Sequence, residues 1–186
     1  MSKRKSIPVM VETAQGERNK LAYDFDSGVL RLTKVLPEGF SFPLNFGSIP
    51  GTIAEDGDPV DILLFMSNPV PPGTLVQARV IGVLEAEQVE GGKRERNDRL
   101  FGVAEASREH RNLLSVREIP DETRREYERF FKAYNAEDRK KFKALGWFGP
   151  KRAMKLVERG RRKFRAPKRP AIPRTFADYA KAAEED

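Results

Sequence analysis

Three aspartates, Asp56, Asp58 and Asp61, lie within six residues of one another at a Gly/Pro turn that precedes the apolar run 62–66. Carboxylates spaced this closely repel one another unless a cation offsets their charge, and Mg²⁺ and Ca²⁺ prefer oxygen ligands. An EF-hand calcium loop is excluded, because Asp61 stands where that loop needs Gly and Ser67 stands where it needs Glu. The spacing therefore indicates a candidate site for a hard cation, with an ordinary Asp/Gly turn as the alternative.

The composition narrows the other chemistry that the chain can perform. It has 186 residues, no cysteine and one histidine, His110. Thiolate catalysis, cysteine-ligated zinc and a disulfide scaffold are thereby excluded, and a His-rich metal site or a Ser-His-Asp triad is disfavoured. A chain of this length buries about two-thirds of its unfolded surface, so it needs no disulfide or structural metal in order to fold.

The formal net charge of +7 is concentrated near the C-terminus. The segment from Lys151 to Arg174 holds eleven basic residues and one acidic residue, whereas the last twelve residues are net acidic and the part up to Pro150 is neutral. We expect a domain over residues 1–160 and a basic, then acidic, tail over 161–186 that is poorly ordered. The basic segment Lys151–Arg174 is either a surface for nucleic acid or an acidic partner, or a solvated extension.

No segment has the pattern of a targeting signal or a membrane span. The longest dense apolar run, Ile62–Met66, is far shorter than the roughly 20 residues that cross a bilayer. We therefore expect a cytoplasmic protein with no membrane partner.

The N-terminal two-thirds of the chain has the patterning of strands and turns. Residues 21–25 and 29–35 flank an Asp-Ser-Gly turn and predict a hairpin. Apolar residues recur at every second position from Phe40 to Phe46, and Pro43 within this run favours an edge or an irregular stretch. Other strands are expected over 9–11, 60–65, 75–84 and 100–104.

Two helices are expected after Pro120. Tyr127, Phe130, Phe131 and Tyr134 share one helix face, which we expect to be core, with Tyr134 alone reaching a functional site. A second helix begins at Pro150 and ends near Gly160, and we expect Trp147 to pack it onto the strands. The predicted fold is mainly β, a small barrel or sheet, with C-terminal helices.

The hexad Asp-Gly-Asp-Pro-Val-Asp at 56–61, followed by aliphatic residues, resembles the signature of the family I soluble inorganic pyrophosphatases. Further blocks resemble this family in the same order along the chain. These blocks are Glu12 with Arg18-Asn19-Lys20, residues 42–47, Pro72-Gly73, residues 81–84, residues 130–134 and Gly146-Trp147. The resemblance extends from Val9 to Val157 and implies an OB-like five-stranded β barrel with C-terminal helices.

The resemblance also implies a reaction and a site. It implies Mg²⁺-dependent hydrolysis of pyrophosphate by metal-activated water, with Mn²⁺ as an alternative ion, in a protein that forms a homo-oligomer. The implied metal ligands are Asp56, Asp58, Asp61 and Glu12, and Asp58 is also the implied base. The implied catalytic cations and hydroxyl are Lys20, Lys34 and Tyr134, which contact phosphate together with Arg99.

The chain departs from the family pattern at positions that carry chemistry. Ala22, Gln88 and Asn97 stand where the family has carboxylates, Phe42 and Phe46 where it has tyrosines, and Asn135 where it has lysine. Lys34 replaces an arginine and Arg99 a lysine. We therefore expect a reduced metal site and a weaker hydrolase, unless Glu87, Glu90, Glu95 or Asp98 supplies a substitute carboxylate.

Two other functions remain open at this point. In one, the chain keeps the pyrophosphatase fold but has weak or no activity, and serves as a binding or regulatory module through its basic segment. In the other, the altered pocket hydrolyses a different phosphoanhydride.

Overall fold

A computed structural model describes residues 6–24 and 27–165 of the chain. Nine strands lie in this part: β1 (Ile7–Thr13), β2 (Asn19–Asp24), β3 (Val29–Val35), β4 (Asn45–Ser48), β5 (Asp61–Phe65), β6 (Leu75–Glu90), β7 (Lys93–Arg96), β8 (Arg99–Ala104) and β9 (Lys141–Phe148). The helices described are α1 (Asp121–Glu137), α2 (Pro150–Lys163) and a short 3₁₀ helix, η1 (Val116–Glu118).

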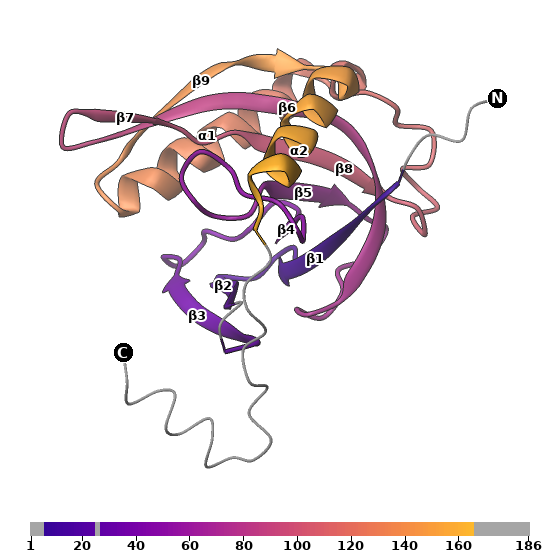
Figure 1. The fold of residues 1–186 in the computed structure, drawn as a ribbon, viewed down its shortest axis with the longest axis horizontal. Helices are drawn as coiled ribbons and strands as arrows, with labels where there is room; N and C mark the ends of the chain where they lie inside the picture. Colours follow the sequence, from indigo (N-terminus) through magenta and orange to yellow (C-terminus); the bar gives the residue numbers. More distant parts are fainter. Residues whose placement is uncertain (1–5, 25–26, 166–186) are drawn as a thin grey trace, which may run out of the picture.

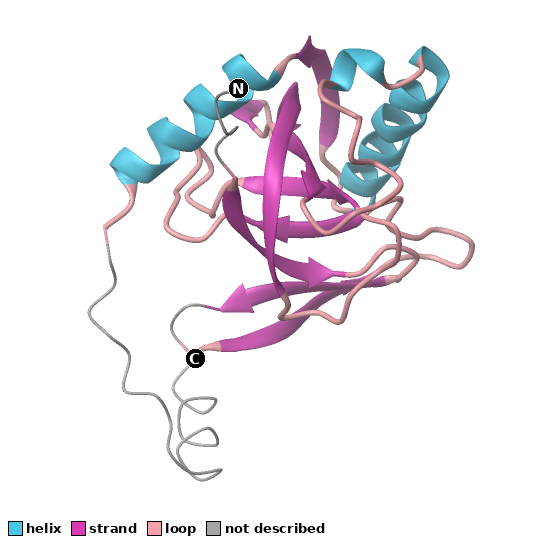
Figure 2. Ribbon diagram, turned by 90° about the vertical axis from the view of Figure 1, so that its right-hand side faces the viewer, coloured by secondary structure: helices cyan, strands magenta, loops and turns pink. Residues whose placement is uncertain are grey.

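Five of these strands close into a barrel. They pair in the order β1-β4-β5-β8-β6, and β6 returns to pair with β1 (Figure 2). The pairs are antiparallel except for β5 with β8, which run parallel. The barrel interior is filled by aliphatic side chains such as Ile7, Val9, Ile62 and Val83, which have no exposed surface. The predicted five-stranded barrel with helices after it is confirmed.

Strand β6 is long and pairs with several other strands along its length. It pairs with β1 at its start, with β8 in its middle, and with β9 and β7 toward its end (Figure 1). The register with β8 shifts at Gly82, whose φ is 159°. A Cβ at Gly82 would lie 2.4 Å from Val116 Cγ2, so only glycine allows the strand to pass η1 this closely.

The predicted hairpin is present as a separate two-stranded sheet. Strands β2 and β3 pair antiparallel, with Asn19 opposite Val35 and Asp24 opposite Val29. Two of the residues between them, 25 and 26, lie outside the described residues. The hairpin stands below the barrel in Figure 2. Lys20, Tyr23 and Thr33 of its strands line a pocket.

The alternating run from Phe40 to Phe46 is buried, but it is a strand only from Asn45 onward. Phe42, Leu44 and Phe46 are buried against α1, as expected for a segment interrupted by Pro43. Helix α1 supplies Tyr127, Phe130 and Phe131 to this second apolar cluster. The apolar face of α1 is therefore core.

Helix α2 packs on the opposite side of the molecule, over the barrel interior. Ala153 and Val157 are fully buried there, and the helix ends at Lys163, beyond the predicted end near Gly160. The role predicted for Trp147 is wrong. Its ring lies 4.9 Å from that of Phe101 and its Nε1 donates to Glu128, so it packs β9 against α1 instead of α2.

The sequence prediction missed β7 and β9. Strand β7 is short and highly charged, and β9 alternates lysines with small and aromatic residues, so neither has a strong apolar period. Both are held by pairing with the far end of β6, which is a tertiary contact.

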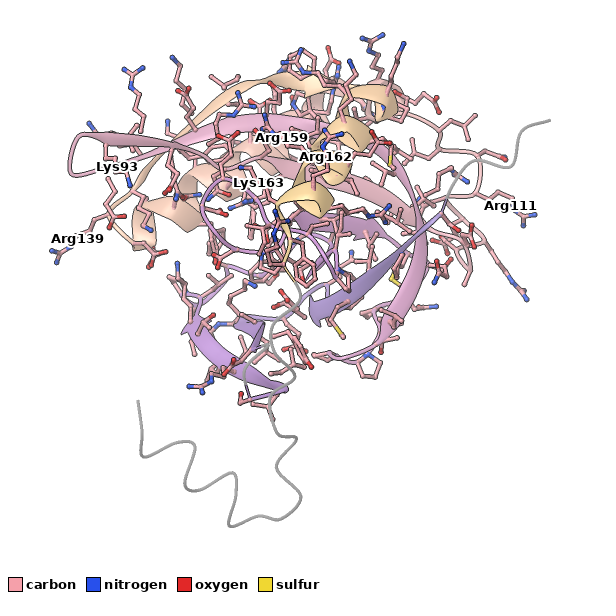
Figure 3. All side chains as sticks on the ribbon, in the orientation of Figure 1. Lys93, Arg111, Arg139, Arg159, Arg162 and Lys163 are labelled. Carbon is pink, nitrogen blue, oxygen red and sulfur yellow. The ribbon has the colours of Figure 1, made fainter. Side chains whose placement is uncertain are left out.

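The described part of the basic segment is the exposed face of α2. Lys151, Lys155 and Arg162 are exposed there, and Figure 3 shows Arg159, Arg162 and Lys163 grouped on this helix. Residues 166–186, which include most of the expected tail, lie outside the described residues. No helix in the described part is long and apolar enough to cross a membrane.

Candidate functional site

A pocket of about 430 Å³ opens between the barrel, the β2–β3 hairpin and the end of α1. It gathers side chains from elements that are far apart in the sequence. Its walls include most of the residues predicted for the site: Glu12, Lys20, Asp56, Asp58, Asp61, Arg99 and Tyr134. Lys34 is not part of the wall itself, but its two contacts, Asp138 and Tyr134, are.

The loop that carries the aspartates is fixed from behind by α2. The backbone N–H of Ile53 donates to the Gly160 carbonyl at 3.1 Å, and Arg159 pairs with Glu55 at 2.5 Å. A Cβ on Gly160 would lie 3.0 Å from Val60, so helix and loop are in close contact. The barrel strand β5 then begins at Asp61 itself. The helix and the strand therefore hold the two ends of the carboxylate loop.

Asp56 and Asp58 face the pocket without a positive partner. Neither forms an ion pair with any described residue, and the Asp56 carboxylate accepts the Asp58 backbone N–H at 3.2 Å. Burial, together with the negative charges of Asp61 and Asp58, raises the pKa of Asp56 to about 6. This part of the pocket therefore carries negative charge that the described side chains do not balance.

Glu12 and Lys20 form a buried pair at the base of the pocket. Glu12 Oε2 lies 3.6 Å from Lys20 Nζ, and Glu12 Oε1 accepts from the Ser48 hydroxyl at 2.8 Å. Burial raises the pKa of Glu12 and lowers that of Lys20, while each opposes the shift of the other. Lys20 Nζ also lies 4.2 Å from the ring centre of Phe46.

Arg99 is tied to Asp61 and to two neutral amides. Its Nη1 lies 2.7 Å from Asp61 Oδ2 and donates to Asn97 Oδ1, and Asn97 Nδ2 donates to Gln88 Oε1 at 2.6 Å. Burial raises the pKa of Asp61 and the Arg99 guanidinium opposes this shift. Arg99 Nε is buried and has no hydrogen-bond partner among the described residues.

Lys34 reaches the rim of the pocket from β3. Its Nζ lies 2.5 Å from Asp138 Oδ2 and 4.2 Å from the ring centre of Tyr134. Burial raises the pKa of Tyr134 to about 12, so its hydroxyl remains a hydrogen-bond donor at neutral pH.

The positions at which the sequence departs from the family pattern are mostly in the pocket wall. Ala22, Phe46, Gln88, Asn97 and Asn135 all line it, whereas Phe42 is 1% exposed and packs behind it on Tyr134. The replacements therefore change the surface that a ligand would meet.

One of the four candidate substitute carboxylates reaches this pocket. Glu95 lines it and accepts from Gln88 Nε2 at 3.3 Å. Asp98 instead accepts the Ala86 backbone N–H and pairs with Arg96, and Glu90 pairs with Lys140. Glu87 is not among the residues of the pocket wall.

The oxygen donors of Asp56 and Asp58 fit a hard divalent cation, because they are unpaired carboxylates beside a polar pocket. The fit is limited to these two. Glu12 and Asp61 are already paired with Lys20 and Arg99, and within residues 6–24 and 27–165 no group of three or more acidic or histidine side chains is arranged to hold a metal ion.

Sequence reasoning missed Ser48 and Asp138. Ser48 continues the alternation of residues that begins at Phe40, and this alternation could have placed it on the face of Phe46. Asp138 directly follows the last residue of α1, so its position depends on where the helix ends. The apolar pattern of the sequence gives no information about a residue at this place.

Comparisons with known proteins agree with this arrangement. The family described as inorganic pyrophosphatase matches residues 9–165. An inorganic pyrophosphatase of Thermus thermophilus is 34% identical, covering 84% of this chain and 95% of the relative, and one of Geobacillus stearothermophilus is 32% identical over 83% and 91%.

Solved structures agree as well. The crystal structure of the Thermus thermophilus inorganic pyrophosphatase has a TM-score of 0.77 at 30% identity, covering 88% of this chain and 93% of the other. The structure of an inorganic pyrophosphatase from Coxiella burnetii has a TM-score of 0.79 at 27% identity, with 88% and 98% covered. The predicted OB-like pyrophosphatase fold is thereby confirmed, and the chain belongs to the inorganic pyrophosphatase family.

Proposed function

We propose that this chain hydrolyses inorganic pyrophosphate to two phosphates in the pocket described above. The observation that carries the proposal is that unpaired carboxylates and buried cations line the same pocket in a member of the inorganic pyrophosphatase family. Such a pocket can bind a divalent cation on one side and a polyanion on the other.

The cationic side of the pocket binds and orients the diphosphate. Lys20 and Arg99 contribute positive charge in a buried setting, where each is paired with a carboxylate. Tyr134 adds a neutral hydroxyl donor, and Lys34 adds an ammonium group at the rim. Together they offset the negative charge that the diphosphate brings.

Asp58 is the residue that we assign as the base. It is exposed to the pocket and carries no ion pair among the described residues, so its carboxylate can accept a proton from an attacking water. The water oxygen forms a bond to one phosphorus, the bond from that phosphorus to the bridging oxygen breaks, and the bridging oxygen leaves with the second phosphate.

Asp56 and Asp58 are the residues that would hold the cation, which we propose to be Mg²⁺, with Mn²⁺ as the alternative. A bound divalent cation supplies Lewis-acid chemistry, since it withdraws charge from phosphoryl oxygens and acidifies water. Glu12, Asp61 and Glu95 lie in the same wall and would support it through water or after their present partners move.

We propose further that the metal site is reduced. The amides of Gln88 and Asn97 hydrogen-bond to each other, and Arg99 neutralises Asp61, so this wall balances its charge without a metal. Titration calorimetry with Mn²⁺ should find one or two bound ions per chain. Three or more ions of comparable affinity would contradict the reduced site but not the hydrolysis.

The reaction is tested by measuring phosphate release from pyrophosphate with Mg²⁺, Mn²⁺ and a chelator. Asp58→Asn keeps the size of the side chain but removes the base, so the rate should fall by at least about a hundredfold. Glu105→Gln removes one negative charge at an exposed position outside the pocket wall and should retain the wild-type rate. Undiminished turnover in Asp58→Asn would remove the assignment of Asp58, and tripolyphosphate and ATP in the same assay would detect a different phosphoanhydride substrate.

A further inference from the structure

The ion pair between Lys34 and Asp138 joins the β2–β3 hairpin to the end of α1 at the rim of the pocket. Its two charged atoms are 2.5 Å apart, and the Lys34 side chain is only 18% exposed. Lys34 has the Tyr134 ring on its other side, at 4.2 Å from the ring centre. The ammonium group is therefore enclosed between a carboxylate and an aromatic face, both of which belong to the pocket wall.

Helix α1 gives no reason for a carboxylate at this point. Asp138 is the C-cap residue of α1, where the negative end of the helix dipole disfavours an acidic side chain. The last turn of α1 contains no basic residue, and the Asp138 backbone N–H is already satisfied by the carbonyls of Ala136 and Asn135. The only ion pair that the Asp138 carboxylate forms within the described residues is with Lys34.

We propose that Asp138 is a binding-site residue that sets the anion affinity of the pocket, because its carboxylate occupies the place on Lys34 that a phosphoryl oxygen takes when the substrate binds. This inference rests on the proposed function, because it assumes that Lys34 contacts phosphate. A carboxylate and a phosphoryl group both accept from an ammonium group, so binding exchanges one acceptor for the other.

The exchange adds the same free-energy cost to the binding of every anion that contacts Lys34, because the ion pair must open first. A phosphoryl group carries between one and two negative charges near neutral pH and has several acceptor oxygens, so it can displace a single carboxylate. A monovalent anion such as chloride gains too little from Lys34 to do so. Asp138 therefore lowers the affinity for every anion that contacts Lys34 by the same factor, so that only anions with a large gain from Lys34 and the rest of the pocket still bind well.

The alternative is that the pair only fastens the hairpin to α1. In that case breaking it from either side would lower stability and would not tighten anion binding. The two roles differ in the sign of one measurement, the change in anion affinity when Asp138 loses its charge.

The experiment measures the dissociation constant of methylenediphosphonate, which has no hydrolysable bridge, by titration calorimetry on the full chain. Asp138→Asn should bind the probe about threefold to fivefold more tightly than wild type, the upper part of the range expected for a half-exposed ion pair. Chloride should also compete with the probe at a lower concentration in this variant than in wild type. Glu137→Gln is the matched control, since Glu137 is exposed, directly precedes Asp138, and loses the same charge in this variant.

Lys34→Gln and the double variant complete the cycle. Lys34→Gln should weaken the binding of the probe. When Asp138→Asn is added to Lys34→Gln, the affinity for the probe should change no more than it does when Glu137→Gln is introduced. Equal affinity of Asp138→Asn and Glu137→Gln would overturn the proposal, and so would the same tightening in the presence and absence of Lys34. Thermal unfolding of each variant checks that it is folded. Because this readout is binding, a chain that released no phosphate would refute the proposed function and still give a result here.

Discussion

Asp56 is the residue at which the pocket departs most from what folding alone would favour. Its carboxylate is partly buried next to Asp58 and Asp61 and forms no ion pair among the described residues, and burial is the main cause that raises its pKa to about 6. A replacement by a neutral residue would relieve this cost. A carboxylate kept in such a place is typical of a functional site.

The raised pKa of Asp56 predicts a specific pH dependence of stability. Its pKa in the folded chain lies above its ordinary value of 3.8, so the folded state binds the proton more tightly. Without metal, the contribution of Asp56 to stability should therefore fall as the pH rises from about 4 to about 6. Asp56→Asn should match wild type near pH 4 and exceed it at pH 7.5 by on the order of 1–3 kcal/mol.

Urea unfolding in a chelator across this pH range tests the prediction, with Glu105→Gln, an exposed position outside the pocket wall, as the control. If Asp56→Asn is no more stable than wild type at pH 7.5, Asp56 is not the strained carboxylate described here. Adding Mg²⁺ should reverse the order, because only wild type keeps both unpaired oxygen ligands.

The residue scale also marks what the sequence could and could not predict. Asp56, Asp58 and Asp61 were identified by spacing and by resemblance, and the structure brings them to one pocket. The pairing of Asp61 with Arg99 and of Lys34 with Asp138 could not be predicted, since each joins distant segments and depends on where the chain turns.

At the scale of elements, α2 and the carboxylate loop behave as one unit. Gly160 accepts a hydrogen bond from Ile53 and leaves no room for a side chain against Val60 and Thr52. The position of the loop that carries Asp56 and Asp58 is therefore set by a helix that contributes none of the pocket wall.

Gly160→Val should consequently weaken metal binding as well as stability. The added methyl groups must displace residues 52–60, which we expect to cost about 1–3 kcal/mol of unfolding free energy. The dissociation constant for Mn²⁺ should rise at least about threefold, beyond any loss from partial unfolding.

Val80→Ala is the matched control for this prediction. Val80 is buried in the same barrel cluster but lies on β6, outside the loop and outside the pocket wall, so its replacement should lower stability with no change in Mn²⁺ affinity. If both variants bind Mn²⁺ as wild type does, α2 does not position the metal loop.

Elements with a clear period were predicted well, and elements held by partners were not. The aromatic stripe of α1 and the alternation in β3 identified both elements. Strands β7 and β9 lack an apolar period and exist because β6 extends to Glu90 and offers them an edge. The same long strand explains why the end predicted for β6 near residue 84 was too early.

At the scale of the whole molecule, the excess positive charge of the exposed α2 face lies outside the pocket wall. The net charge of +7 comes from the C-terminal part, where α2 exposes Lys151, Lys155 and Arg162, and none of these three lines the pocket. The closed barrel could be predicted only through the resemblance, because β1 meets β6 across a long stretch of sequence.

This separation predicts that the basic helix face can be neutralised without loss of catalysis. The variant with Lys151, Lys155 and Arg162 all replaced by Gln should keep kcat and KM for pyrophosphate within about twofold of wild type, while any binding to nucleic acid should weaken and depend less on salt. A large increase in KM would mean that the helix face takes part in substrate capture.

Phosphate release from pyrophosphate by the wild-type chain, with Mg²⁺ and then with excess chelator, tests the central claim most directly. The pocket of unpaired carboxylates and buried cations predicts steady release with Mg²⁺ that stops when the chelator is added and that Asp58→Asn nearly abolishes. No release with Mg²⁺ or Mn²⁺, or release that continues unchanged in chelator, would contradict it.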